Sequence, residues 1–571
     1  MKKLLCVISA FAVLHGAQAQ LTTFQTNGAP DKRHTVFAFT NAHIQADAET
    51  VIGNGTMLVQ DGMITDIGTT VNIPKGAVVY DMQGKWIYPS FIDPYTTYGM
   101  PEPKRSPWTP GPQYFSARDG AYGWNDALKP ETDASAVFSS DKKAAEEMRG
   151  LGFGTVMVYS NDGIARGTAS CVTLNAEDGD NSVFVKQKVA NCLSFDKGTS
   201  RQEYPSSLMG AIALLRQTYY DADWYRTAKN RKEFNLSLEA WNNVQSLPQI
   251  FETTDKWNVL RADKVGDEFN IQYIFKGSGN EYQRMNEMKN TNASFILPLN
   301  FPKAFDVSDP YDAEQIAYTD LKHWEMAPLN PGAFEKYGIN FALTTSDLED
   351  KKDFWENLRK AIKFGLSEKA ALKALTTVPA QLLGIADKTG ALKKGLLANF
   401  IITNGNVFTD DAVIWENWVK GKQYILRDAN TVDVRGTYSM TVGGNPMTLD
   451  VEGDIFKPRG SFKKIDSIKG PVNVSCDGNR VDISWTYKKS GTTVLLTGLI
   501  DPKTKAMSGS GQEPDGTWIK WSATQTAPFT PKPEPKDTTA PDIPSLDDVI
   551  YPFAPFGRTI KDSLEIDRFQ M

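Results

Sequence analysis

The sequence predicts an α/β protein in which a parallel (β/α)8 barrel of the TIM type lies between two strand-rich flanks and is followed by an antiparallel β-domain. Two observations support this prediction. Between residues 93 and 396, apolar strand-like runs such as FGTVMVYS and INFALTTSD alternate with helical stretches such as DFWENLRKAIKFG, which is the pattern of a parallel α/β barrel. Before and after this region, the chain reads as short strands separated by turns.

Length and charge narrow the class of protein. The chain has 571 residues, enough for two or three domains. Hydrophobic residues make up 41% and charged residues 23%, as is typical of a folded globular protein. The formal net charge is -6, without the basic surplus of a nucleic-acid-binding surface, so we expect no nucleic-acid partner. No stretch after the N-terminal leader is apolar enough to cross a bilayer, so we also expect no membrane span.

The leader itself, residues 1–19, has the pattern of a secretory signal peptide. Lys2 and Lys3 precede an apolar run, and the small-residue pattern AQA ends it at Ala19. We therefore expect cleavage before Gln20 and export to the periplasm or the medium.

The opening β-region is expected at residues 20–92. It contains TVFAFTNAHI and GTMLVQDGMITDIG, and Asp61-Gly62 within the second run is a tight hairpin signal. Strand-like runs return at 397–435, where ANFIITNGNVF and KQYILRDANTVDV are expected to complete this opening β-domain.

Helices of the barrel region, 93–396, show the expected period. In DFWENLRKAIKFG the apolar side chains fall on one helical stripe and Gly365 is placed to end the helix. The stripe consists of Phe354, Leu358, Ala361 and Ile362. A stripe of this kind faces the core of the domain.

A third region, 436–525, is nearly all strand and turn and predicts a small antiparallel sandwich or barrel. Its Trp485, Trp518 and Trp521 either stack on a sugar or belong to the core, and strand positions favour the core. Residues 526–571 form a proline-rich linker and a tail too short to make a core of its own.

The cysteines leave two alternatives open. Cys171 and Cys192 lie in strand-like runs on either side of the turn-like sequence AEDGDNS. They either face each other across a hairpin as a disulfide or are two small buried side chains, and the sequence favours neither.

Several motifs resemble the amidohydrolase superfamily, of the imidazolonepropionase-like kind. The resemblance rests on MLVQDGMITDIG, DMQGKWIYPSFIDPYTTYG, INFALTTSD, GLSEKAALKALTTVPAQLLGIADKTGALKKG and ANFIITNG, in this order and spacing. It implies that both flanks form one composite β-sandwich around a metal-dependent barrel. It also implies hydrolysis of carbon–nitrogen bonds other than peptide bonds, with metal ions that activate water at the carboxyl ends of the strands.

The residues depart from that resemblance at the metal ligands. The first-strand motif should read Asp-x-His-x-His, but residues 93–97 read DPYTT. The mature chain has three histidines, His34, His43 and His323, and only the last lies in the barrel region. The usual metal centre therefore cannot be built, and at most a single zinc, manganese or iron ion is expected as a cofactor.

Asp347, at the end of INFALTTSD, matches the last-strand aspartate that the resemblance makes a metal ligand and general base, so it is the candidate catalytic residue. The candidate pocket around it consists of Asp93, Tyr95, Thr97, His323 and Glu325. Asp347 and His323 either share one metal or form a metal-free acid–base cluster with Glu325. The alternative is that these side chains are structural remnants held by hydrogen bonds.

Two functions remain open. By lineage the chain is a hydrolase with a degenerate metal centre, weakly active or inactive, that acts on a small-molecule substrate. Alternatively it is a pseudoenzyme, either a small-molecule-binding module or a scaffold. It also resembles the metal-less N-terminal half of long exported amidohydrolases of Bacteroidetes-type bacteria, which implies a second, catalytic amidohydrolase-like chain or domain as partner, docked through residues 528–571.

Overall fold

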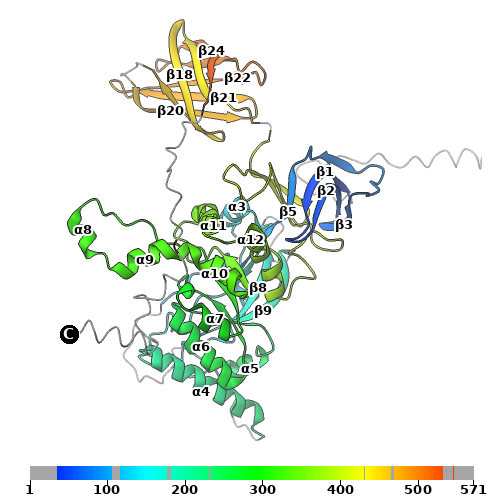
Figure 1. Ribbon diagram of the computed structural model, residues 1–571, viewed down its shortest axis with the longest axis vertical. Coiled ribbons are helices and arrows are strands. Elements are labelled where there is room, and N and C mark those ends of the chain that lie inside the picture. The colour runs from blue at the N-terminus through cyan, green and yellow to red at the C-terminus, as the bar shows by residue number, and fades with distance from the viewer. Residues whose placement is uncertain are drawn as a thin grey trace, which may run out of the picture.

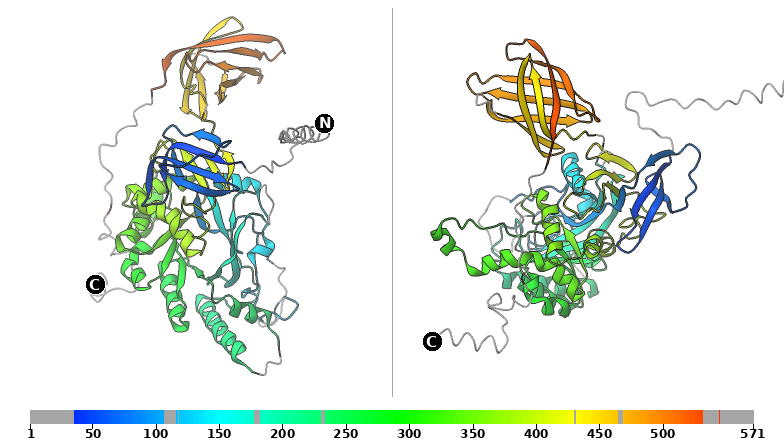
Figure 2. Two further views of the ribbon diagram at one scale, coloured as in Figure 1. Left: turned by 90° about the vertical axis from the view of Figure 1, so that its right-hand side faces the viewer. Right: turned by 45° about the horizontal axis from the view of Figure 1, so that its top comes forward.

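The computed structural model describes residues 35–105, 116, 118–176, 182–229, 233–429, 431–463, 468–530 and 544. It consists of a composite β-sheet, an α/β barrel and a C-terminal β-barrel, and Figures 1 and 2 show the C-terminal barrel as a separate body at one end of the molecule. The predicted signal peptide and nearly all of the predicted linker and tail lie outside the described residues.

The two flanks of the barrel join in a single eight-stranded sheet. β14 pairs antiparallel with β5, which brings the second flank against the first. The strand order is β16-β15-β14-β5-β1-β2-β3, with β4 paired to β1. The strands are β1 (Phe37–Gln45), β2 (Val51–Gln60), β3 (Met63–Gly68), β4 (Val78–Asp81), β5 (Trp86–Pro89), β14 (Phe400–Thr403), β15 (Ile414–Val419) and β16 (Lys422–Ile425). The expected composite domain therefore forms, but its strands hydrogen-bond into one sheet rather than the two sheets of a sandwich.

The central sheet also has eight strands, in the order β13-β12-β11-β10-β9-β8-β7-β6. Its strands are β6 (Phe91–Thr96), β7 (Phe153–Val158), β8 (Ala165–Thr173), β9 (Phe184–Ser194), β10 (Gln249–Glu252), β11 (Tyr273–Lys276), β12 (Ser294–Pro298) and β13 (Phe341–Thr344). The edge strands β13 and β6 meet through a side chain, because the Thr344 hydroxyl shares its proton between the Asp93 carboxylate at 2.6 Å and the Tyr95 carbonyl at 3.1 Å. Contacts between β13 and β6 thus bring the two edges of the sheet together as a barrel, although no backbone pairing joins these two strands among the described residues.

One strand departs from the predicted (β/α)8 pattern. β8 pairs antiparallel with both β7 and β9, so the expectation of eight parallel strands was wrong. The connections explain the difference. Six residues separate the end of β7 from the start of β8, too few for the crossover that a parallel pair requires, and β8 and β9 form a hairpin.

Helices cover the outside of this barrel, and α8 and α9 project from it (Figure 1). In α11 the predicted stripe is buried at Phe354, Leu358 and Ala361, while Ile362 is partly buried. The helices are α2 (Ala134–Val137), α3 (Lys142–Gly150), α4 (Leu208–Thr227), α5 (Leu236–Asn243), α6 (Lys256–Phe269), α7 (Met285–Asn290), α8 (Pro310–Gln315), α9 (Tyr318–Met326), α10 (Asn330–Tyr337), α11 (Phe354–Lys363), α12 (Glu368–Leu375) and α13 (Thr377–Leu382). Within the described residues, no helix is both long and apolar enough to span a membrane.

The third region is a closed antiparallel barrel, which confirms the predicted antiparallel β-domain. Trp485 and Trp521 are buried in its core, whereas Trp518 is 72% exposed on its outer surface. Its strands are β17 (Gly436–Val442), β18 (Asn445–Asp454), β19 (Lys457–Phe462), β20 (Ile468–Asp477), β21 (Arg480–Tyr487), β22 (Thr493–Ile500), β23 (Met507–Gln512) and β24 (Trp518–Pro528). The prediction that all three tryptophans are core residues holds for two of them.

Cys171 and Cys192 lie on β8 and β9 as buried free thiols. Lys186 stands opposite Cys171, and Gly167 stands opposite Cys192. The register therefore separates the two cysteines, and the structure selects the buried-side-chain alternative over the disulfide.

Candidate functional site

The carboxylate of Asp93, within β6, joins the two edge strands of the α/β barrel. Thr344 donates its hydroxyl to one carboxylate oxygen at 2.6 Å, and the Tyr95 backbone N–H donates to the same oxygen at 3.1 Å. Thr345 donates its hydroxyl at 2.6 Å and its backbone N–H at 2.9 Å to the other oxygen. Burial raises the pKa of Asp93, although these four donors act in the opposite direction. The structure thus uses this side chain to hold β13 against β6.

Tyr95 points into the barrel and is fully buried. Its ring stacks on Tyr159 with 4.1 Å between the ring centroids. Its hydroxyl donates to Glu252 at 3.3 Å and accepts from Arg166 at 3.0 Å. Thr97, two residues further on, is exposed beyond the end of β6. Tyr95 and Thr97 occupy the two positions where the motif has histidines. Tyr95 lies inside the barrel and Thr97 lies outside it.

A buried ion pair crosses the interior next to Tyr95. Arg166, on β8, pairs with Glu252, at the end of β10, and their side chains are 4% and 20% exposed. Burial works to raise the pKa of Glu252, but Arg166 and Lys276 outweigh it and the pKa lies below its usual value. Glu252 is therefore an anion held by two cations.

Lys276, the last residue of β11, extends this network to the candidate catalytic residue. Its side chain is 1% exposed and its ammonium pairs with Asp347, whose side chain is 41% exposed. Asp347 adopts a left-handed backbone conformation, with φ at 64°, just after β13. Tyr95, Arg166 and Glu252 contact one another, and Lys276 contacts Asp347. Lys276 and Glu252 stand opposite each other on β11 and β10 and interact electrostatically, so we call these five side chains the mouth network.

The remaining two candidates, His323 and Glu325, lie on α9 and have other partners. His323 shares a hydrogen bond of 2.9 Å between its Nδ1 and the Tyr282 hydroxyl, and burial lowers its pKa. Glu325 pairs with Lys322 at 2.6 Å. In the described part of the chain, neither makes a hydrogen bond or an ion pair with Asp347. The structure therefore does not bring these two side chains into the mouth network.

The mouth network lies at the carboxyl ends of barrel strands, where barrel enzymes place their sites.

The chain is similar to known proteins of the amidohydrolase family. Residues 316–439 match the model of this family. The imidazolonepropionase of Flavobacterium johnsoniae is 21% identical over 370 residues, and that of Christiangramia forsetii is 21% identical over 389 residues. Each alignment covers 62% of this chain and 85% of the relative. A crystal structure of an amidohydrolase from Thermotoga maritima is similar with a TM-score of 0.52 at 19% identity, over 68% of this chain and 99% of that one. The chain is thus similar to the amidohydrolase superfamily, of the imidazolonepropionase-like kind.

The residues present do not fit the metal centre that this superfamily implies. Within the described residues, no group of three or more His, Cys, Asp or Glu side chains could hold a metal ion. Both oxygens of Asp93 already accept two hydrogen bonds each. Asp347 is paired with the Lys276 ammonium. Metal ligation would require these carboxylates to leave their partners.

The prediction from sequence missed Arg166, Glu252 and Lys276. Two of them carry a readable signal, because Glu252 ends the apolar run QIFE and Lys276 ends YIFK. A charged residue at the last position of a buried parallel strand points to the site face of a barrel. Arg166 has no such signal, because it lies near the start of β8 and not at the end of a parallel strand.

Proposed function

We propose that this amidohydrolase-like chain binds a small polar molecule at the barrel mouth without the metal-dependent hydrolysis of its lineage. The observation that carries the proposal is the ion pair between Lys276 and Asp347. The carboxylate that would hold a metal and accept a proton is neutralised by a buried ammonium. Because two cations face two anions in the mouth network, the network balances its own charge and favours a neutral ligand over an ion.

The chemistry of Asp347 suggests the ligand class. The Asp347 side chain is the exposed partner of the ion pair with Lys276. One carboxylate oxygen accepts from Lys276 and the other accepts from the Ser346 hydroxyl at 3.2 Å. Each carboxylate oxygen can accept more than one hydrogen bond, so Asp347 can also accept from a ligand. The two bacterial relatives are imidazolonepropionases by name. We therefore propose a small molecule with an amide-like ring that carries an N–H group.

Ligand binding is tested with hydantoin, a neutral ring of this class, on the mature chain beginning at Gln20. In ligand-observed NMR titrations, hydantoin is expected to bind, and Asp347→Ala is expected to weaken binding about 10-fold or more, because a charge-assisted hydrogen bond contributes about 1.5–3 kcal/mol. The control is Asp515→Ala, an exposed turn carboxylate of the C-terminal barrel. Equal binding by wild type and Asp347→Ala, or no binding, would contradict the proposal.

Metal content is the second test. Plasma mass spectrometry of the mature chain, purified without chelators, is expected to find no stoichiometric zinc, manganese or iron in wild type or in Asp347→Ala. The reason is that metal binding must displace Lys276 from Asp347 and Thr345 from Asp93. Near-stoichiometric metal that disappears in Asp347→Ala would overturn the metal-free proposal.

A second candidate function is residual hydrolysis of a carbon–nitrogen bond with Asp347 as general base. The 41% exposure of the Asp347 side chain favours it, because a base must reach substrate and water. Opening of hydantoin by the wild type, lost in Asp347→Asn with unchanged thermal stability, would establish this function instead.

Export and partnership complete the proposal. The predicted signal peptide supports a periplasmic or secreted location, and the proline-rich stretch after the C-terminal barrel supports docking to a catalytic amidohydrolase-like chain or domain through residues 528–571.

A further inference from the structure

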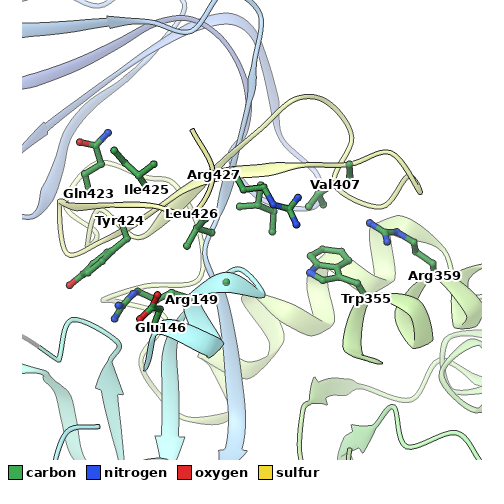
Figure 3. Close-up of a pocket in the computed structure, with 13 residues that line it drawn as sticks. Glu146, Arg149, Trp355, Arg359, Val407, Gln423, Tyr424, Ile425, Leu426 and Arg427 are labelled. Atoms are coloured by element: carbon green, nitrogen blue, oxygen red, sulfur yellow. The ribbon is translucent and has the colours of Figure 1, made fainter. Parts of the chain in front are cut away.

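A cavity separate from the mouth network lies where the α/β barrel meets the composite sheet (Figure 3). It has a volume of about 790 Å³, within the range of small-molecule sites. Its walls come from α3, α11, the strand β16 and the segment that follows β16. Three arginines line it: Arg149, Arg359 and Arg427.

Arg359, on α11, has only a weak partner for its charge. Its side chain is 21% exposed, and the distance from its Nε to the nearest Asp410 oxygen is 3.9 Å, with the Asp410 side chain 75% exposed. Within the described residues, its Nε is buried and makes no hydrogen bond. Burial lowers the pKa of Arg359, so the surrounding groups do not fully compensate the charge. The guanidinium lies 5.3 Å from the centroid of the Trp355 ring.

Arg427 approaches the same cavity from the composite sheet side. In Figure 3 its guanidinium extends toward the side of the cavity that holds Trp355 and Arg359. Its partner is the ring of Phe456, 4.9 Å from the guanidinium to the ring centroid, and the described residues show no ion pair for it. Two guanidinium groups therefore converge on one cavity with little negative charge between them, an arrangement that an anion would stabilise.

The third arginine and one carboxylate lie on α3. Arg149 is 5% exposed and lies 3.9 Å from the centroid of the Tyr424 ring, with one N–H donated to the Leu174 carbonyl. Glu146 is the acidic side chain among the lining residues, so the arginines outnumber the carboxylates three to one. The cavity thus has a positive interior.

Part of the wall is apolar, although Gln423 also lines the cavity. Val407, Ile414 and Leu426 line the cavity together with the Trp355 ring. An inorganic anion would leave this surface uncovered, whereas a molecule with an apolar or aromatic body would cover it while its carboxylate reaches the arginines.

We propose that this cavity binds a small organic carboxylate, with the carboxylate between Arg359 and Arg427 and an apolar or aromatic body against Trp355. This site is independent of the function proposed for the barrel mouth. Guanidinium groups match carboxylates by paired hydrogen bonds, and the aromatic wall supplies the contact area.

The test is calorimetric titration of the mature chain with 3-phenylpropionate, its neutral amide and inorganic phosphate. The acid is expected to bind with a dissociation constant of about 1 mM or tighter, and the amide and phosphate about 10-fold more weakly or worse. Arg359→Gln combined with Arg427→Gln is expected to weaken binding of the acid about 10-fold or more. The matched control is Arg226→Gln, a surface arginine on α4 whose side chain is 65% exposed.

Four results would each overturn the proposal, and a melting-temperature control accompanies them. Absence of saturable binding of the acid excludes the site, and unchanged binding in the double variant places it elsewhere. Equal binding of the amide shows that the arginines do not select a charge. Equal binding of phosphate shows an anion site without an organic ligand. A melting temperature of the double variant equal to that of Arg226→Gln separates lost binding from lost folding.

Discussion

Replacing Arg166 with Met is expected to destabilise the α/β barrel by about 3 kcal/mol. The change leaves Glu252 at the end of β10 without its close cation, and breaking one side of a buried pair costs about 3–5 kcal/mol. The lower end applies because the Glu252 side chain keeps 20% exposure and Lys276 still acts on it. Urea unfolding, followed by circular dichroism, measures the loss as a lower midpoint.

Two variants make this result specific. Arg480→Gln, in an exposed pair with Asp482, is expected to change stability by less than about 0.5 kcal/mol. Adding Glu252→Gln to Arg166→Met is expected to recover part of the loss, because it removes the stranded charge. If Arg166→Met shifts the midpoint no further than Arg480→Gln, the mouth network does not stabilise the barrel.

Replacing Trp521 with Ala is expected to destabilise the C-terminal barrel by about 3–5 kcal/mol. The side chain is 3% exposed, and its indole N–H donates to the Thr497 carbonyl at 3.0 Å. The ring also fills the space over Gly498, where an added Cβ would come within 2.6 Å of it. The variant therefore loses a large buried area and leaves a carbonyl without its donor. Thermal unfolding monitored by circular dichroism measures the effect.

Trp518 provides the matched control, because it is the same residue type on the same strand. Its side chain is 72% exposed, so Trp518→Ala is expected to change stability by less than about 0.5 kcal/mol. Similar losses in the two variants would mean that the two side chains do not differ in burial. Neither variant should change binding at the mouth network, since the barrels have separate cores.

The strand period explains why one tryptophan prediction was wrong. Trp518 and Trp521 are three residues apart on β24, and successive side chains of a strand alternate between its faces. Both could not face the same core. The three-residue spacing can be read from the sequence and excludes a shared face once both residues are assigned to one strand. Only the structure shows which of the two tryptophans faces the core.

The candidate site was predictable only in part. Asp93 and Asp347 were recognised from the motifs that end two strands, and both lie at the mouth of the barrel. His323 and Glu325 were joined to them because both are titratable and His323 is the histidine of the barrel region, yet α9 directs them to Tyr282 and Lys322. Sequence distance does not decide which side chains meet when helices project from a barrel.

The sequence by itself indicated the resemblance to the amidohydrolase superfamily, the alternation of strands and helices in the barrel region, and the loss of the imidazole ligands, because these follow from motifs, residue types and local periodicity. Only the tertiary structure decided that β8 runs antiparallel and that Arg166, Glu252 and Lys276 meet Tyr95 and Asp347. The physical reason is that a charge buried in an apolar strand needs a partner, and its partner lies on a strand far away in sequence. Chain connectivity and packing choose that partner, and no local pattern records the choice.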